Sequence, residues 1–205
     1  PFPTRRSSDL AKETYIDPNT GQASPITFVG AENPDAIVRD ARGRWWVSSY
    51  NKQQSVFMLF GPDGPQGGKP IWTRPFGGNH PIKELWHFGP LPDGSGAWGV
   101  DPESGHLFLI SAADGAILQT VGRGVVAKPT RVWVLPDRSV LAADAAWGVL
   151  LVSADGAESW RVVEDLPAGR TWSLYLDEPT GRLFYIIETS GSVRYGWAEP
   201  LFDSR

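Results

Sequence analysis

The sequence predicts an all-β fold made of four-stranded antiparallel sheets. Three observations indicate it: short apolar runs, tight-turn signals that close them, and the return of those signals at a nearly constant interval. The region 148–187 shows all three, because its apolar runs are closed by the signals SADG, DLPAG and DEPTG. Gly or Pro interrupts nearly every window long enough for a helix, so we expect none.

Two series of turn signals interleave along the chain. In the first series the Asp residues are spaced by 46, 51 and 41 residues; they are Asp17, Asp63, Asp114 and Asp155. The second series consists of DARG (40–43), LPDG (91–94), LPDR (135–138) and DEPTG (177–181). An Asp-Gly pair can make the positive-φ turn that joins antiparallel strands. Two interleaved series with a period of about 40–50 residues describe a four-stranded unit, the blade of a β-propeller.

The apolar runs predict three complete blades and two incomplete ones. The complete blades span residues 36–76, 84–121 and 130–164. Residues 12–28 supply the last two strands of an earlier blade, and three strands at 171–176, 182–188 and 193–199 begin a further one. Such near-continuous apolar runs suit strands that are covered on both faces by neighbouring blades. A β-sandwich is the alternative, and the regular turn spacing favours the propeller.

The two ends of the chain lead to two expectations. Residues 1–10, PFPTRRSSDL, fit no blade and resemble a translated sequencing-library adapter, so we treat them as an artefact or a disordered leader. Residues 11–205 are then predicted to form a single propeller domain, a fragment of a larger propeller. An open arc would expose the apolar faces of its terminal blades, which predicts self-association.

Composition excludes several classes of function. The net charge of −4 and the pI near 5.4 argue against a nucleic-acid partner. The absence of Cys excludes disulfides, thiol catalysis and Cys-ligated zinc. No apolar run is long enough to span a membrane. By analogy with propellers of similar composition, we expect an extracytoplasmic protein, periplasmic or secreted.

The segment 153–160, SADGAESW, resembles the Asp-box of BNR-repeat propellers. Ser153, Asp155, Ser159 and Trp160 match the motif, and Ala157 stands where the motif has Gly. In that family the Asp-box lies on the outer side of the blade, so the resemblance implies a fold and no chemistry. A glycoside hydrolase is a weak reading of the same motif, because it requires two facing carboxylates.

The segment 33–64 resembles a repeat of the NHL and gluconolactonase (regucalcin)-like propellers. The matching residues are Pro34, Asp35, Asp40, Gly43, Trp46, Val47, Tyr50, Asn51 and Gly64, whereas Ala36 replaces the Gly of the family. The resemblance implies that Asp35 points into the central channel, binds a divalent metal such as Ca²⁺ and takes part in lactone opening. It also implies an Asn and a Glu ligand in sequence that this chain lacks.

Strand register adds further candidate ligand-binding residues. The second strands of the blades end at Tyr50, Asp101, Asp144 and Glu188, which predicts an acidic ring at one rim, although charge at strand ends is often only solvation. The inner strands bring His87, Arg131 and Thr171 to a similar depth near the channel mouth, where a His can also be a hydrogen-bonded filler. His80 lies on a Gly-rich connection, and we expect no role for His106.

These observations favour a non-catalytic propeller module that binds a protein, a glycan or a small ligand on its loop face. The divergent blades contain no complete catalytic set, and a platform of this kind needs no cofactor. The alternative is a metal-dependent lactone or ester hydrolase of the gluconolactonase-like type, which would require a divalent metal at Asp35.

Overall fold

The computed structural model describes most of the chain between residues 14 and 198. The described residues are 14–16, 23–51, 54–65, 67–122, 124–154, 156–165, 170–177, 180, 182–189 and 192–198. The segment 1–10, Asp17 of the first turn series and Asp155 of the predicted Asp-box lie outside them.

All regular secondary structure in the described residues is β-strand, as predicted. The first pair comprises β1 (Thr14–Ile16) and β2 (Ala23–Pro25). Three groups of four follow: β3 (Pro34–Arg39), β4 (Trp45–Ser49), β5 (Val56–Phe60) and β6 (Pro70–Pro75); β7 (His87–Pro90), β8 (Gly96–Asp101), β9 (His106–Ser111) and β10 (Ile117–Val121); β11 (Pro129–Val134), β12 (Val140–Asp144), β13 (Val149–Ser153) and β14 (Arg161–Asp165). The last group is β15 (Arg170–Asp177), β16 (Arg182–Thr189) and β17 (Ser192–Ala198).

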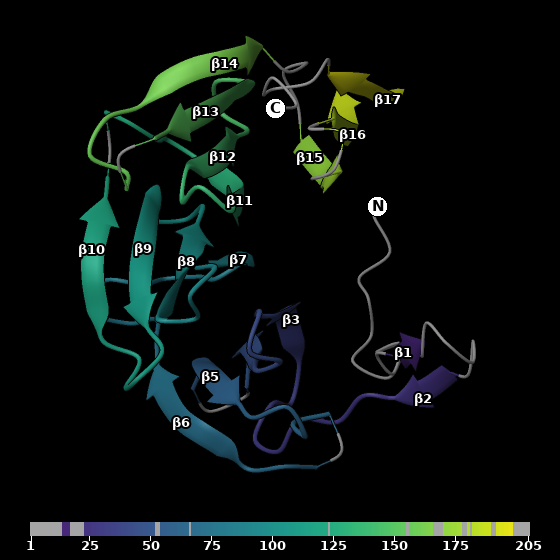
Figure 1. Ribbon diagram of the computed structural model, residues 1–205, viewed down its shortest axis with the longest axis vertical. Helices are drawn as coiled ribbons and strands as arrows, with labels where there is room; N and C mark the ends of the chain where they lie inside the picture. The colour runs from purple at the N-terminus through teal and green to yellow at the C-terminus, as the bar shows by residue number, and fades with distance from the viewer. Residues whose placement is uncertain are drawn as a thin grey trace.

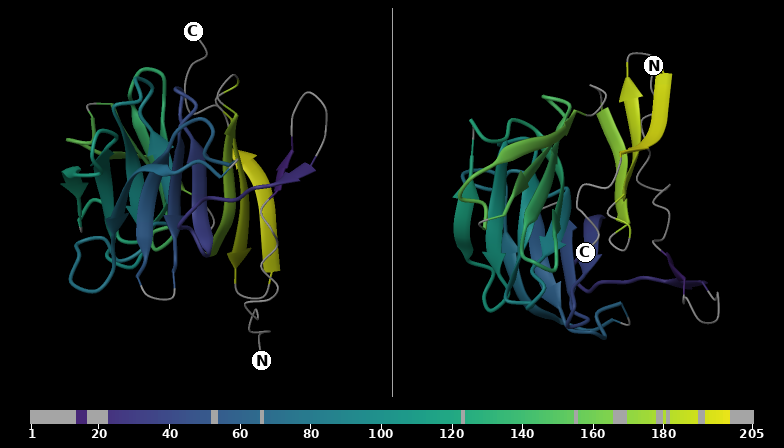
Figure 2. Two further views of the ribbon diagram at one scale, coloured as in Figure 1. Left: turned by 90° about the horizontal axis from the view of Figure 1, so that it is seen from below. Right: turned by 45° about the horizontal axis from the view of Figure 1, so that its top comes forward.

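Each group forms its own antiparallel sheet in which strands that follow one another in sequence are neighbours. The three four-stranded sheets confirm the three complete units predicted from the turn series. Figure 1 shows the sheets arranged as an open arc, with β3, β7, β11 and β15 nearest its centre and β6, β10 and β14 on its outer side. In the turned view of Figure 2 the strands of the successive sheets run in roughly the same direction. No helix in the described residues is long and apolar enough to cross a membrane.

The core lies between the sheets. Trp46, Phe57 and Phe88 belong to a buried cluster formed by the first two four-stranded sheets, and Trp98 and Val132 belong to a cluster between the second and the third. A third cluster joins β12 and β13 to β16. Because strands β8, β12 and β13 are buried along their whole length, apolar side chains are needed on both of their faces. This explains why their sequences show little alternation.

The DARG, LPDG and LPDR signals of the second series form tight turns that are held by their Asp side chains. In LPDG, the carboxylate of Asp93 accepts the N–H of Ser95 at 2.9 Å, and Gly94 has a φ of 65°. In LPDR, Arg138 takes the same left-handed conformation with a φ of 70°, which is uncommon for a residue with a side chain. The Arg138 guanidinium forms an ion pair with Asp93 at 2.8 Å, so the two turns contact each other.

Two side-chain hydrogen bonds tie the first four-stranded sheet to the second. The indole N–H of Trp72 in β6 donates to the carbonyl of Ala112 after β9 at 2.9 Å. The hydroxyl of Ser48 in β4 donates to the carbonyl of Leu85 before β7 at 2.8 Å. Both bonds are buried, and they hold the first two four-stranded sheets at a fixed position relative to each other. That position sets which polar side chains meet at the centre of the arc.

Candidate functional site

The inner strands β3, β7 and β11 all begin at the same end of their sheets. We call this the top end. In β3 the pairing with β4 shifts between Pro34 and Ala36, so Asp35 has no partner across the ladder. In β11 an equivalent shift precedes Arg131. A β-bulge of this kind takes a side chain out of the regular alternation of the strand. By its accessible surface Asp35 is exposed at this bulge, although neighbouring atoms crowd its carboxyl group closely enough to raise its pKa by partial burial.

Asp35 and Arg131 come from two sheets and interact electrostatically. Burial raises the pKa of Asp35, and the positive charge of Arg131 opposes that shift. Burial lowers the pKa of Arg131, and the negative charge of Asp35 opposes it in turn. Neither residue belongs to an ion pair in the described part of the chain. One guanidinium nitrogen of Arg131 donates to the carbonyl of Thr130 at 2.8 Å.

His87 begins β7, the inner strand that lies between β3 and β11. Its Nδ1 accepts a long hydrogen bond of 3.5 Å from the backbone N–H of Val132 in β11. Its ring also lies against Trp133, with the centroids 6.2 Å apart. Burial, together with the nearby charge of Arg131, lowers the pKa of His87 to about 4. The imidazole is therefore neutral at neutral pH.

Two further titratable groups lie at the top end, the phenol of Tyr50 and the carboxyl group of Glu84. The hydroxyl of Tyr50, after β4, is buried and has no hydrogen-bond partner among the described residues. Burial raises the pKa of Tyr50, and the negative charges of Glu84 and Asp35 add to this effect. Burial also raises the pKa of Glu84, just before β7. Glu84 was not selected from the sequence, although it opens the predicted apolar run 84–91.

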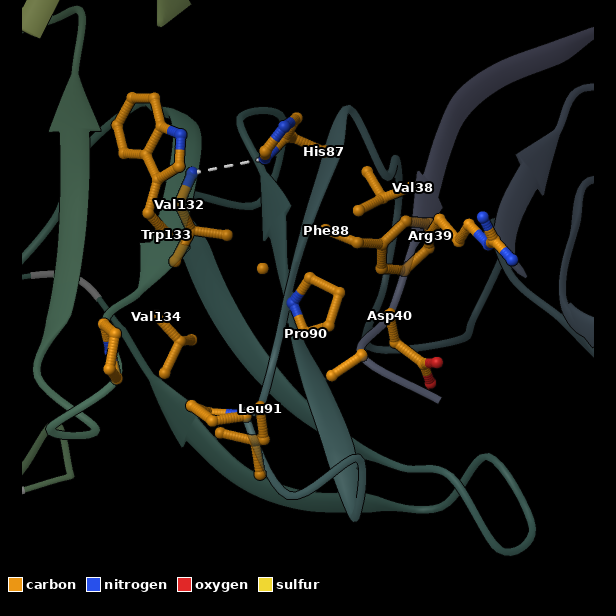
Figure 3. A pocket seen from close by; sticks show the side chains of 14 residues that line it. Val38, Arg39, Asp40, His87, Phe88, Pro90, Leu91, Val132, Trp133 and Val134 are labelled. Atoms are coloured by element: carbon orange, nitrogen blue, oxygen red, sulfur yellow. Dashed lines mark hydrogen bonds between the residues drawn. The ribbon is translucent and has the colours of Figure 1, made fainter. Parts of the chain in front are cut away.

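We refer to these five residues as the mouth cluster: Asp35, Tyr50, Glu84, His87 and Arg131. An open groove of about 410 Å³ adjoins it and is lined by β3, β7 and β11. Figure 3 shows that His87 lies at one end of this groove and Leu91 towards the other. Between them the lining is largely apolar, with Val38, Phe88 and Val134 among its side chains. The polar groups of the mouth cluster thus adjoin an apolar wall.

Comparison with known proteins identifies the architecture. No protein-family model matches the chain, and no curated protein sequence matches it. Many solved structures do match, including a chain of a nidogen/laminin complex, at 14% identity and a TM-score of 0.64. The match covers 85% of this chain and 65% of that one. The chain has a β-propeller fold.

Two enzymes also share this propeller fold. Hydrazine synthase of Kuenenia stuttgartiensis matches at 13% identity and a TM-score of 0.58, over 83% of this chain and 46% of that one. Virginiamycin B lyase of Staphylococcus aureus matches at 16% identity and a TM-score of 0.53, over 80% and 55%. The chain thus spans about half to two thirds of the propeller proteins that it resembles. At these identities the likeness shows the fold alone.

Asp101, predicted as part of an acidic ring, is fully buried at the end of the second strand of its blade. Its carboxylate accepts the N–H of Lys83 at 2.6 Å, of Glu103 at 3.0 Å and of Ser104 at 2.9 Å. The first bond holds the segment that enters the blade, and the other two cap the following turn. The oxygens of Asp101 are therefore used by the backbone.

Asp144 occupies the equivalent position in the next blade and is also buried. Its carboxylate accepts the N–H of Ala127 at 2.6 Å, Lys128 at 2.9 Å, Ala146 at 2.9 Å and Trp147 at 3.2 Å. A role of Asp101 and Asp144 in ligand binding stays a prediction, and both carboxylates have an architectural role in the structure. This arrangement could not be recognised from the sequence, because Ala127 and Lys128 lie 17 and 16 residues before Asp144.

The remaining candidate residues have other neighbours than those of the mouth cluster. Glu188 is a partly buried residue near the end of β16, paired with Arg170. Thr171 pairs with Ile187 at the start of β15, and its side chain lies outside the described residues. The Nδ1 of His80 accepts the N–H of Ile82 at 3.2 Å, which holds the loop before β7.

The metal prediction concerns Asp35. No group of three or more His, Asp or Glu in the described residues is arranged to hold a metal ion. The strongest electrostatic partner of Asp35 is Arg131, a cation. A fixed positive charge beside a carboxylate disfavours a second cation there. In the described part of the chain, the donor set around Asp35 therefore does not fit a hard divalent metal.

Proposed function

We propose that the chain is a non-catalytic propeller module that binds a small polar ligand at the top end, on the mouth cluster. One observation supports this proposal: Arg131 interacts electrostatically with both Asp35 and His87, so the inner strands of three blades bring a guanidinium, a carboxylate and an imidazole near one another. Ligand sites commonly combine an apolar wall with a few convergent polar groups of this kind.

The size of the adjoining groove favours a small ligand. Its volume of about 410 Å³ falls within the usual range of roughly 300–1,000 Å³ for small-molecule sites. His87 belongs both to the mouth cluster and to the lining of the groove, so one ligand can contact both. A protein or an extended glycan would need a wider surface than this groove offers.

The contacts of His87 support binding rather than catalysis. Nucleophilic catalysis needs a hydroxyl or thiol within hydrogen-bond reach of a base. The hydrogen bond that the His87 ring makes in the described part of the chain comes instead from a backbone N–H, that of Val132. The imidazole is thus held by the neighbouring blade, in a position where it can present its other nitrogen to a ligand.

A ligand screen tests this proposal. Ligand-observed NMR with a library of small polar compounds should detect binding to the wild-type chain that is lost in the double variant Asp35→Ala/Arg131→Ala. Arg138→Ala is the matched control, because Arg138 lies in the turn that follows the far end of β11, with a side chain that is 68% exposed. Equal loss in the control variant, or binding only by glycans or proteins at another face, would reject the mouth cluster as the site.

A metal-dependent lactone or ester hydrolase is the second candidate, and it rests on the resemblance of residues 33–64, because the donor set around Asp35 in the described residues does not by itself fit a divalent metal. It requires that a divalent cation displace Arg131 from the neighbourhood of Asp35. Thermal stabilisation by Ca²⁺ that disappears in Asp35→Ala and persists in Asp137→Ala would support this candidate. Hydrolysis of a lactone by the wild-type chain alone would establish it over the binding module.

A further inference from the structure

We propose that the last sheet, β15–β17, forms a dimer interface and that the same sheet of a second copy of this chain covers it. The interface is the side of the sheet that points away from the third four-stranded sheet, and we call it the terminal face. It consists of six large apolar side chains, Tyr175, Phe184, Ile186, Val193, Tyr195 and Trp197. The inference concerns a different surface from the mouth cluster and does not depend on the ligand site.

The pairing of the three strands brings the side chains of the terminal face together in rows. Phe184 in β16 pairs with Tyr175 in β15 and with Trp197 in β17. In the next row, Ile186 pairs with Tyr195. Because side chains alternate along a strand, the residues between these in β16 point the other way and pack against the third four-stranded sheet. The terminal face is therefore one continuous apolar surface.

This surface is both exposed and large. Its side chains are 41–86% exposed, and they are six of the eleven large hydrophobic side chains that are exposed in the described part of the chain. Since an aromatic side chain has about 150–250 Å² of surface, the six leave roughly 600 Å² of apolar area open to solvent. Monomers rarely expose a larger patch, and a stable dimer buries about 800 Å² on each partner. The terminal face supplies most of that area.

The charged residues on this side of the sheet lie at the ends of the strands. Arg182 begins β16 and pairs with Asp177, so these two charges offset each other, while Glu188 pairs with Val193 near the opposite end. The two rows between them contain no charged residue on this side. Two copies can therefore stack with their apolar centres in contact. If their strands run in opposite directions, Glu188 of one copy lies opposite Arg182 of the other rather than opposite a second Glu188.

The packing within the chain indicates that a sheet is the fitting partner. Each pair of neighbouring sheets from β3 to β17 buries an apolar cluster between two such faces. At the other end of the arc in Figure 1, the face of the first four-stranded sheet is covered by the segment that precedes β3. In that segment Phe28 is 4% exposed and packs against Trp45 and Phe60. Self-association through the terminal face is therefore isologous, with the same sheet on both sides.

Sedimentation equilibrium of the full chain tests the dimer. The wild-type chain should form a species of twice its mass of 22.4 kDa that dissociates on dilution. Tyr195→Lys and Ile186→Lys should each weaken the dimer by about tenfold or more, because each places a charge at the centre of the interface. Leu118→Lys is the matched control, because Leu118 in β10 is 61% exposed and lies on another sheet. Thermal melts exclude loss of folding, and Ile186→Ser supplies an uncharged second variant.

Cross-linking tests the arrangement of the two copies. The chain contains no cysteine, so a single introduced thiol reports on one position. Ile186→Cys places that thiol at the centre of the terminal face. A short bismaleimide should therefore link it to its counterpart in the second copy, whereas Leu118→Cys should remain unlinked at the same concentration.

Three results would overturn the proposal. A monomer at every concentration would show that a second copy does not cover the terminal face, and its occupant would then be a different molecule or segment. A dimer that persists in both Tyr195→Lys and Ile186→Lys would place the contact on another surface. A dimer that is lost in Tyr195→Lys and kept in Ile186→Lys would indicate pairing along the edge of β17, because Ile186 lies one strand further in.

Discussion

The backbone N–H of Val132 donates to Nδ1 of His87 and so joins the inner strands of two neighbouring blades. The bond is long, at 3.5 Å, and it requires Nδ1 to act as an acceptor. Protonation of Nδ1 would therefore break it. The same ring contacts Trp133 and lines the inner groove. His87 therefore links the stability of the blade interface to the state of the mouth cluster.

This link predicts a pH dependence of stability. The pKa of His87 is about 4 in the folded chain, below its ordinary value of 6.5, because burial and the charge of Arg131 disfavour the imidazolium. Between these two values the unfolded chain takes up the proton first, so the stabilisation is complete above pH 6.5 and is lost as the pH falls towards 4. The loss is on the order of 3 kcal/mol at most.

Urea denaturation of the wild type and of His87→Gln between pH 7 and 4.5 measures this contribution. The difference between the two free energies of unfolding should shrink or reverse as the pH falls, and Arg131→Gln should make the wild-type dependence shallower. Two parallel pH curves for wild type and His87→Gln would contradict the burial of a neutral imidazole.

The carboxylate of Asp144 predicts a large effect on stability. Asp144→Ala leaves four backbone N–H groups without their acceptor, two before β11 and two after β12. We expect a loss of about 3 kcal/mol or more in the free energy of unfolding, since buried unsatisfied donors cost about 1–3 kcal/mol each and partial solvation offsets some of that. Asp114→Ala is the control, because Asp114 is exposed and accepts one N–H, from Ala116. Equal destabilisation by both substitutions would refute the architectural role of Asp144.

Trp72 and Trp46 form a matched pair of buried indoles. The N–H of Trp72 donates to Ala112 of the next blade, whereas the N–H of Trp46 is buried and has no partner among the described residues. Both Trp→Phe substitutions remove a similar apolar area, but only Trp72→Phe leaves a carbonyl without its donor. Trp72→Phe should therefore cost about 1–2 kcal/mol more than Trp46→Phe in chemical denaturation. A larger cost for Trp46→Phe would show that its N–H is satisfied.

At Gly96, the first residue of β8, the neighbouring strand leaves no room for a side chain. A Cβ at this position would lie 2.5 Å from the carbonyl oxygen of Ile110 in β9, and this oxygen belongs to the backbone rather than to a flexible side chain. Gly96→Ala should cost about 2 kcal/mol or more, because the two strands must move apart. Gly61→Ala has nothing within 4 Å of the new Cβ and should change the free energy of unfolding by less than about 0.5 kcal/mol. Thermal melts of the two variants decide the point.

Much of the fold could be predicted because its signals are local. The turns at 91–94 and 135–138 rest on an Asp side chain that accepts an N–H two residues later, and this interaction needs no distant partner. In the second of these turns Arg138 takes a left-handed conformation. The predicted blades at 36–76, 84–121 and 130–164 agree with the three four-stranded sheets for the same reason.

The candidate site could be predicted only in part. The register of the inner strands indicated His87 and Arg131, and the resemblance indicated Asp35. Glu84 was missed because nothing in its neighbourhood distinguishes it from an ordinary charged residue at a strand end. Asp101 and Asp144 were indicated as a rim of free carboxylates, although their acceptor capacity is taken up by amides that lie 16–18 residues earlier in the chain.

The sequence by itself determined the strands, their turns and their order in the sheets, since these follow from side chains a few residues apart. Only the tertiary structure decided which polar groups the backbone uses and which face a charged side chain of another blade. The reason is that a carboxylate such as Asp144 or Asp35 has the same chemistry everywhere. Its role depends on whether distant amides or a neighbouring guanidinium reach it once the blades have packed.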